Sequence, residues 1–294
     1  MARDQALAGA GGVISLEYGV RQARNLGLTT QELSLAGLPP QVCGRRVLHI
    51  TDGHLSPPSH LARRIIHLAH SASPDWIFVT GDMFLGAHGP RATATFLSQL
   101  AGIAPTFVVT GNADYCSSAA PEPGRAYFGA AQGLLNRAQL LADGNHPCWI
   151  AGVSDPHVGR DRLEEALDGV PQDAWIIVLA HSPDIILRPL SRRARLIFAG
   201  HTHGGQVCLP GFGALYTRTR VSRRYASGVH HLGNTTLVVS RGAGTTRLPI
   251  RIFCPAEMTL WCLTRKEEGA GSPDPATTRL QERPRPNWRA SGEL

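Results

Sequence analysis

Residues that can bind a metal ion follow five short apolar segments of this 294-residue chain. In chain order, they are Asp52 and His54, Asp82, Asn112, His181, and His201 and His203. Ligands of open α/β sheets bind beyond the carboxyl ends of the strands. If the five segments are strands of such a sheet, we expect these turns to meet at one edge.

The chemistry of this set points to divalent metal ions. It offers carboxylate, amide and imidazole groups without a thiolate, which suits Mn²⁺, Fe²⁺, Zn²⁺ or Mg²⁺. Two Asp, one Asn and four His are too many ligands for one ion that keeps an open position. They fit two ions that share a bridging carboxylate and lie about 3.5 to 4 Å apart, an arrangement that activates water and clamps a phosphoryl group.

The elements that must position these residues alternate between strands and helices. Short β-branched or aromatic runs predict buried strands. The predicted strands are 47–51, 76–80, 106–110, 149–153, 175–180, 196–199, 236–240 and 258–263. Apolar spacing predicts helices over 59–71 and 91–100. This alternation implies βαβ units, and by itself indicates a layered α/β fold.

The ordered motifs DGH, GD, GNAD, a single His and GHTH resemble those of the calcineurin-like metallophosphoesterases, over roughly Cys43 to Arg265. The run GHTHGGQVCLPG is similar to a bacterial branch that includes a membrane-associated phosphodiesterase and lipid A precursor pyrophosphatases. The resemblance implies an α/β fold with two facing mixed β-sheets flanked by helices, a four-layer sandwich. We therefore expect a leader over 1–40, one metallophosphoesterase domain over 41–265 and a disordered tail over 266–294.

The resemblance also implies roles for individual residues. One metal ion would be held by Asp52, His54 and His203, and the other by Asn112, His181 and His201, with Asp82 bridging the two. Asp82, Asn112 and Asp114 are the implied catalytic residues. Asp155 and Asp184 are each interpreted either as orienting a ligand or as capping a turn. The remaining histidines, His157 among them, match no motif and are interpreted as surface or packing residues, with His60 and His230 the foremost exceptions.

One position departs from the family pattern, which has His where this chain has Ala113. In the family that His is regarded as protonating the leaving oxygen. A phosphate leaving group has a second pKa of about 6 and departs as an anion, whereas an alkoxide needs a proton. We therefore hypothesise a preference for pyrophosphate bonds or other good leaving groups, with Arg241 binding substrate and supplying the lost positive charge.

Charge and composition limit the classes of molecule that this protein is expected to bind. The formal net charge is +7, and the stretch from Ile185 to Ala256 contains eleven Arg and no Asp or Glu. Such a field attracts phosphate-bearing molecules and anionic lipids. No run of about 20 apolar residues predicts a membrane span. We expect a cytoplasmic protein with peripheral contact to an anionic membrane and a small-molecule or lipid-linked phosphate-ester or pyrophosphate substrate.

The function predicted from these observations is metal-dependent hydrolysis of phosphodiester or pyrophosphate bonds by a water molecule that two metal ions activate. Two alternatives stay open. A nucleic-acid phosphodiesterase would use the same ions and bind its substrate with a steep salt dependence. A non-catalytic metal-binding module would explain Ala113 directly. The chain has neither GxxxxGK[ST] nor GxSxG, which disfavours a P-loop enzyme and a serine hydrolase.

Overall fold

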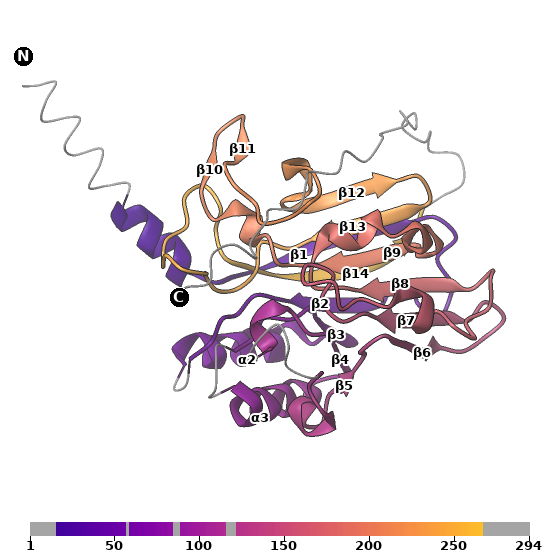
Figure 1. The fold of residues 1–294 in the computed structure, drawn as a ribbon. Helices are drawn as coiled ribbons and strands as arrows, with labels where there is room; N and C mark the ends of the chain where they lie inside the picture. The colour runs from indigo at the N-terminus through magenta and orange to yellow at the C-terminus, as the bar shows by residue number, and fades with distance from the viewer. Residues whose placement is uncertain (1–15, 57–58, 85–88, 116–121, 267–294) are drawn as a thin grey trace, which may run out of the picture.

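The computed structural model describes residues 16–56, 59–84, 89–115 and 122–266, and forms two six-stranded sheets (Figure 1). The first has the strand order β1 (Gly27–Leu35), β14 (Glu257–Arg265), β2 (Arg46–Ile50), β3 (Trp76–Val79), β4 (Thr106–Val108) and β5 (Gln132–Gly133). The second has the order β12 (Gly228–Leu232), β13 (Thr235–Val239), β9 (Leu196–Ala199), β8 (Trp175–Leu179), β7 (Cys148–Gly152) and β6 (Arg137–Ala142). Both sheets mix parallel and antiparallel pairs. A separate hairpin pairs β10 (Cys208–Leu209) with β11 (Gly213–Ala214).

The two sheets pack face to face through side chains that alternate along each strand. In β3, Phe78 points into the cluster shared by both sheets, whereas Ile77 and Val79 join the cluster beneath the helices. In β8, Ile177 faces the shared cluster and Ile176 faces the opposite side. Because successive residues of a strand point to opposite faces, a strand covered on both sides must be apolar throughout.

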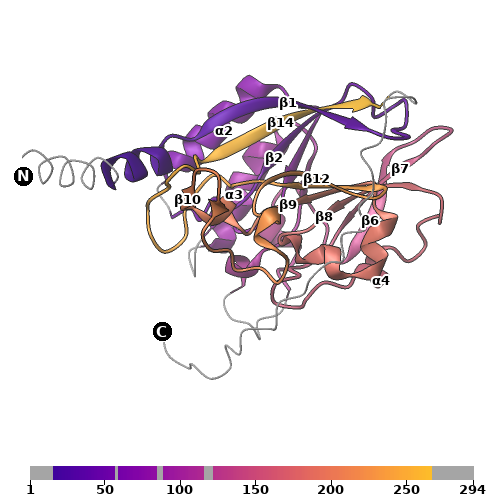
Figure 2. The same cartoon turned by 90° about the horizontal axis from the view of Figure 1, so that it is seen from above.

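Helices cover the outer face of the first sheet, and shorter elements cover that of the second (Figures 1 and 2). The helices are α2 (His60–Ala72) and α3 (Gly89–Ala101). The shorter elements on the other side are α4 (Leu163–Ala166), η4 (Pro183–Leu187), η5 (Pro189–Arg193) and η7 (Arg223–Tyr225). Ser59 caps α2 by accepting a hydrogen bond from the Ala62 N–H at 3.1 Å. Three further one-turn helices are η2 (Asn112–Asp114), η3 (Arg125–Phe128) and η6 (His203–Gly205).

The expected fold class is confirmed. Every predicted strand matches an observed one, namely β2, β3, β4, β7, β8, β9, β13 and β14, within a few residues at each end. The two predicted helices are α2 and α3. The sequence interpretation missed β1, β5, β6 and β12, which are edge strands of the two sheets, and the β10–β11 hairpin.

The sheet begins earlier than the domain start expected at residue 41. Strand β1 lies within the expected leader and pairs in parallel with β14 over nine residues. Leu33 and Leu35 of β1 are buried in the cluster between the sheets, so this part of the segment belongs to the fold. Residues 1–15 of the expected leader and 267–294 of the expected tail lie outside the described residues. Within the described part of the chain, no helix is long and apolar enough to cross a membrane.

Candidate metal centre

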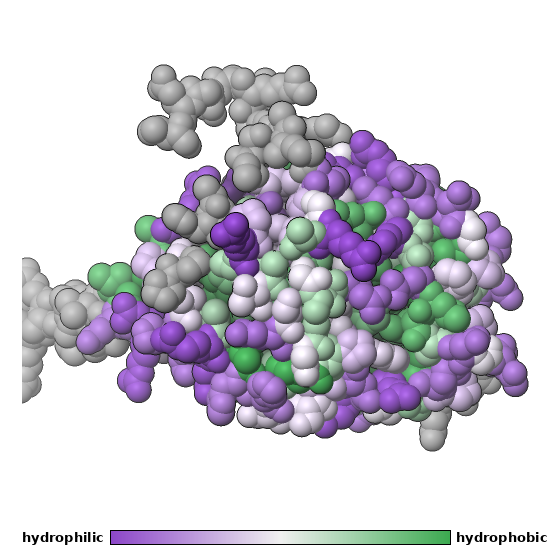
Figure 3. Space-filling model, turned by 90° about the horizontal axis from the view of Figure 1, so that it is seen from below, coloured by the Kyte–Doolittle hydropathy of each residue, from purple (hydrophilic) through white to green (hydrophobic). Residues whose placement is uncertain are grey.

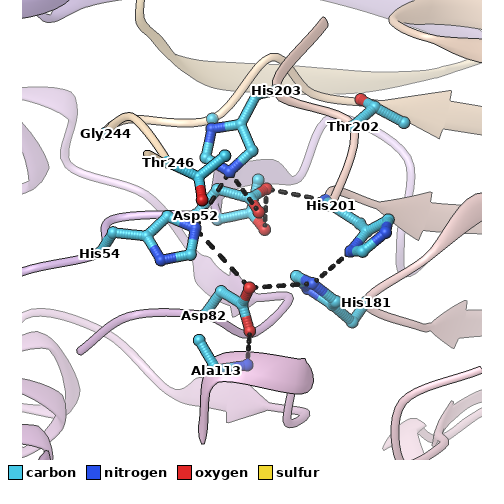
Figure 4. A network of polar contacts seen from close by, with 12 residues as sticks. Asp52, His54, Asp82, Ala113, His181, His201, Thr202, His203, Gly244 and Thr246 are labelled. Carbon is cyan, nitrogen blue, oxygen red and sulfur yellow. Dashed lines mark hydrogen bonds and ion pairs between the residues drawn. The ribbon is translucent and has the colours of Figure 1, made fainter. Parts of the chain in front are cut away.

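The turns that follow β2, β3, β8 and β9 bring their polar side chains face to face, and the turn after β4 reaches the same place through the Ala113 N–H (Figure 4). Two overlapping groups place their ligand atoms within 4.8 Å of one another: Asp52, His54 and His203, and Asp52, Asp82 and His181. Glycines allow this close approach. A Cβ on Gly200 would lie 2.1 Å from Thr51 Oγ1 and 2.4 Å from Asp52 Oδ2.

Short distances connect the imidazoles and carboxylates across the centre. His54 Nε2 lies 3.0 Å from His203 Nε2 and 3.6 Å from Asp82 Oδ2. His181 Nε2 lies 3.3 Å from the same Asp82 oxygen. His201 Nδ1 lies 3.1 Å from His181 Nε2. Nitrogen atoms aimed at one another and at shared carboxylate oxygens are the arrangement that a cation between them would stabilise.

Hydrogen bonds to backbone carbonyls orient two of these imidazoles. His181 Nδ1 donates to the Thr80 carbonyl at 2.7 Å, which leaves Nε2 directed into the centre. His201 Nε2 donates to the Arg218 carbonyl at 3.2 Å, which leaves Nδ1 on the inner side. Because a carbonyl only accepts, each bond fixes the tautomer and the orientation of the ring, as second-layer partners of metal ligands do.

One carboxylate oxygen of each aspartate is also hydrogen-bonded within the protein. Asp52 Oδ2 accepts from the Thr51 hydroxyl at 2.9 Å and from the His201 N–H at 2.8 Å. Its Oδ1 is buried, lies 3.4 Å from His203 Nε2, and makes no hydrogen bond among the described residues. Asp82 Oδ1 accepts from the Ala113 N–H at 2.7 Å, and Oδ2 faces the imidazoles. A buried carboxylate oxygen that faces imidazole nitrogens without a hydrogen bond fits a divalent cation.

The turn after β4 contributes Asn112 and Asp114 in different ways. Asn112 Oδ1 is buried without a hydrogen-bond partner among the described residues, as expected of a ligand atom. Asp114 supports the turns instead. Its Oδ2 accepts from the N–H groups of Asp82 and Gly111, each at 2.8 Å, and its Oδ1 accepts from the Tyr127 hydroxyl at 2.6 Å.

Five of the expected ligands have left-handed backbone conformations, which non-glycine residues rarely adopt. Their φ angles are 54° for Asp52, 43° for His54, 55° for Asp82, 70° for His201 and 50° for His203. Such strain costs on the order of 1–3 kcal/mol for each residue and concentrates at functional sites. The packing around these turns must therefore impose a geometry that the local sequence does not favour.

Burial and the neighbouring charges set the protonation of the centre. Burial lowers the pKa of His203 to about 4, and burial with the nearby His181 holds the pKa of His201 well below its usual value. Both imidazoles are then neutral, which is the form that binds metal. Burial alone would raise the pKa of Asp82, but His181 and His54 outweigh it and hold this pKa below its ordinary range, so the carboxylate is ionised.

The family model described as calcineurin-like phosphoesterase matches residues 45–205, which contain the whole candidate centre. The chain belongs to this family. The geometry and the family together support a metal-dependent phosphoesterase.

Several curated relatives of this calcineurin-like phosphoesterase are similar along most of its length. It is 29% identical to the uncharacterized metallophosphoesterase YkuE of Bacillus subtilis, over 77% of this chain and 81% of that protein. It is also 29% identical to the phosphodiesterase YaeI of Escherichia coli, over 73% of this chain and 80% of that protein. A transmembrane protein with metallophosphoesterase domain from Bos taurus is 30% identical over 84% of this chain, and there the match spans only 59% of the relative.

Solved structures match this chain at lower similarity. The structure of TT1561 from Thermus thermophilus has 17% sequence identity and a TM-score of 0.44, and the match covers 68% of this chain and 89% of that one.

Arg241, the expected substrate-binding residue of this phosphoesterase, faces a carboxylate. Its Nε donates to Glu257 Oε2 at 2.7 Å, its Nη2 contacts the same oxygen, and its backbone N–H donates to Glu257 Oε1 at 2.9 Å. This pair ties the turn after β13 to the start of β14. The role of Arg241 in binding substrate stays a prediction.

His157 is the residue at the centre that the sequence analysis did not single out. It lies in the turn after β7, and its ring packs against that of His201 with centroids 4.3 Å apart. Its Nδ1 is 4.0 Å from Asp184 Oδ2, and about a quarter of its side chain is exposed. Its place shortly after β7, which neighbours β8 in the second sheet, was the signal in the sequence that could have identified it. His60 instead contacts Arg63 on α2, and His230 contacts the Ser227 carbonyl.

Asp155 caps a turn, and Asp184 accepts hydrogen bonds from a distant segment of the chain. Asp155 Oδ1 accepts from the His157 N–H at 2.8 Å, and burial raises the pKa of Asp155 to about 6. Asp184 Oδ1 accepts from the N–H groups of Arg220 and Val221. These bonds position the segments that carry His157 and the carbonyl partner of His201.

A fully buried arginine holds the loops behind His203. The Arg251 guanidinium donates to the carbonyls of His203 at 3.2 Å, Arg241 at 2.7 Å and Gly242 at 3.1 Å. It also donates to the Gly244 and Cys254 carbonyls. These carbonyls would otherwise be buried without partners, so Arg251 stabilises the loop that closes one side of the centre.

Proposed function

We propose that this protein hydrolyses phosphodiester or pyrophosphate bonds with two divalent metal ions. Asp52, His54 and His203 would hold one ion, and Asn112, His181 and His201 the other, with Asp82 between them. The observation that carries the proposal is the pair of overlapping ligand groups around Asp52, whose buried Oδ1 makes no hydrogen bond among the described residues. When bound, the ions would lower the pKa of a water molecule and offset negative charge on the phosphoryl oxygens.

The protein's own groups prepare the centre for this chemistry. The Thr80 and Arg218 carbonyls keep one nitrogen each of His181 and His201 directed inward. The Ala113 N–H holds one oxygen of Asp82, so the other remains available. Because these partners are in place before any substrate arrives, binding does not require the ligands to reorganise.

The leaving group that we propose follows from position 113. The Ala113 methyl group cannot donate a proton, and its backbone N–H is already used by Asp82. A departing phosphate or aryl oxide needs no proton, whereas a departing alkoxide does. A small-molecule or lipid-linked pyrophosphate or activated ester is therefore the substrate class that this centre favours.

The test uses full-length protein that has been stripped of metal and reloaded with Mn²⁺. Turnover is measured on an activated aryl phosphodiester, a nucleotide-sugar pyrophosphate and a simple alkyl diester, for the parent and for Ala113→His and Asp82→Asn. We expect cleavage of the first two substrates, a gain on the third with Ala113→His, and loss of all activity with Asp82→Asn.

Two outcomes would contradict the proposal. Equal rates on the alkyl and aryl diesters would refute the leaving-group preference. Bound Mn²⁺ without turnover of any substrate, in the parent and in Ala113→His alike, would favour a metal-binding module over an enzyme.

A further inference from the structure

Exposed apolar side chains gather at one end of the molecule. Among the described residues, ten large hydrophobic side chains are exposed. Eight of them lie on three short segments, and these are Leu16, Tyr18, Leu209, Phe212, Leu215, Tyr216, Leu248 and Phe253. Phe212 and Tyr216 are strongly exposed, with 60% and 68% of their surface accessible. Single exposed apolar residues are ordinary, but a group of this size marks an interaction surface.

The three segments form one continuous surface, which we call the docking face: residues 16–24, which are helical, residues 208–218 around the β10–β11 hairpin, and residues 247–253. The Tyr18 and Phe253 rings lie 6.1 Å apart. The Arg251 N–H donates to the Gly19 carbonyl, and the Cys208 N–H donates to the Ile252 carbonyl, both at 2.9 Å. Figures 1 and 2 both show the three segments side by side at the end where the helix projects.

The charge of the docking face is almost entirely positive. Its exposed arginines are Arg21, Arg24, Arg218 and Arg247, whereas Arg251 is buried, and Glu17 is its single acidic residue. Arg223 lies at its border, with its guanidinium 4.8 Å above the Phe212 ring and a hydrogen bond to the Leu215 carbonyl. Exposed apolar side chains accompanied by arginines are typical of surfaces that insert into the headgroup region of an anionic membrane. The face seen from below mixes hydrophilic and hydrophobic residues (Figure 3).

We propose that the docking face binds the surface of an anionic phospholipid bilayer. Leu209, Phe212 and Tyr216 would enter the headgroup region while the arginines contact lipid phosphates. A second copy fits less well, because a symmetric contact through this face would place arginines against arginines. The docking requires no turnover, so it can be tested independently of the proposed hydrolysis.

The docking face is also joined directly to the candidate centre. The hairpin segment begins just after η6, which carries His203, and the Thr246 N–H donates to Gln206 Oε1 at 2.6 Å. Figure 4 shows Gly244 and Thr246 beside His203 and Asp52. A bilayer on this face would therefore lie close to the ligands of the centre.

The experiment measures cosedimentation of the full-length protein with vesicles. Vesicles of phosphatidylcholine alone are compared with vesicles that also contain phosphatidylglycerol, at low and at high salt. We expect binding to the anionic vesicles at low salt, and weaker binding to neutral vesicles or at high salt. Each arginine near an anionic surface contributes about 1 kcal/mol, so Arg218→Gln with Arg247→Gln should weaken binding about 30-fold.

Matched controls separate the docking face from general charge and apolarity. Arg125→Gln with Arg137→Gln removes the same charge elsewhere, and we expect at most a small change. Phe212→Ser with Tyr216→Ser should weaken binding at least as strongly as the arginine pair. Leu140→Ser with Val229→Ser removes exposed apolar residues elsewhere and should have little effect. If the serine variants unfold at a lower temperature, the arginine pairs alone decide the test.

Three results would overturn the proposal. One is the absence of binding to anionic vesicles at low salt. Another is an equal loss in the docking-face and control variants. The third is a dimer in light scattering, without vesicles, that Phe212→Ser with Tyr216→Ser converts to a monomer, because the face would then bind a second copy.

Discussion

Replacement of Gly111 by Ala adds one methyl group, and we expect this group to displace residues of the metal centre. Gly111 has φ −108° and ψ −178°, an extended conformation that alanine adopts without strain. Its Cβ, however, would lie 2.2 Å from Asp82 Oδ1 and 2.6 Å from His181 Nδ1. Both atoms are already held, by the Ala113 N–H and by the Thr80 carbonyl, so neither can move without losing a hydrogen bond.

The size of the effect follows from these distances. Asp82 would have to retreat by about 1 Å to reach an ordinary van der Waals contact with the new methyl group. Misplacement of a reacting group by about 1 Å can cost on the order of 10²-fold in rate. Loss of the bonds that orient metal ligands typically costs about 10- to 100-fold in affinity. The overpacking itself should lower the free energy of unfolding by about 1–3 kcal/mol.

Calorimetric titration of Mn²⁺ into metal-stripped protein measures the affinity, and hydrolysis of an aryl phosphodiester measures the turnover. Urea denaturation reports the stability. Gly124→Ala is the control, because Gly124 also has a negative φ and a Cβ there would meet nothing within 4 Å. Mn²⁺ affinity and turnover of Gly111→Ala equal to those of the parent, or the same losses in Gly124→Ala, would refute this prediction.

Three further predictions concern stability. Mn²⁺ at about 100 times its Kd should raise the free energy of unfolding by about 2.7 kcal/mol; differential scanning calorimetry should show a higher Tm for the parent and not for Asp82→Asn. Tyr127→Phe leaves Asp114 Oδ1 without its hydroxyl donor and should cost about 1–3 kcal/mol in urea denaturation, whereas Tyr216→Phe, at an exposed hydroxyl, should cost almost nothing. Burial lowers the pKa of His49 to about 3, so the unfolded chain takes up its proton first as the pH falls below about 6.5. The parent should therefore lose about 2 kcal/mol more than His49→Gln between pH 6.5 and pH 5, and parallel losses would contradict this.

The sequence predicts the inner strands and the positions of the candidate ligands because both have local signals. Strands buried on two faces are continuous apolar runs, and the polar residues stand directly after them, as Asp82 stands after β3. Strand β1 has no such signal. Among its nine residues only Leu33 and Leu35 are buried, because it lies at the edge of the sheet. Its place depends on β14, which is more than 200 residues away in the chain.

The surroundings of the candidate ligands depend on tertiary contacts that no local spacing encodes. His157 reaches His201 because the turns after β7 and β9 approach in space. Arg241 has the charge expected of a phosphate-binding residue, but its guanidinium is paired with the carboxylate of Glu257, sixteen positions later in the chain. The left-handed backbone of the expected ligands is likewise imposed by packing, since neither His nor Asp requires it.

The position of β14 between β1 and β2 has a consequence for synthesis of the protein on the ribosome. Strand β1 is among the first parts of the fold to be made, yet its partner β14 is the last described strand. At about 5–20 residues per second, roughly 10 to 45 seconds separate the two. During that interval Leu33 and Leu35 have no sheet to cover them, and β2 lacks its outer neighbour. The nascent chain therefore carries two unpaired strand edges until β14 emerges, and this is when it would benefit most from a chaperone.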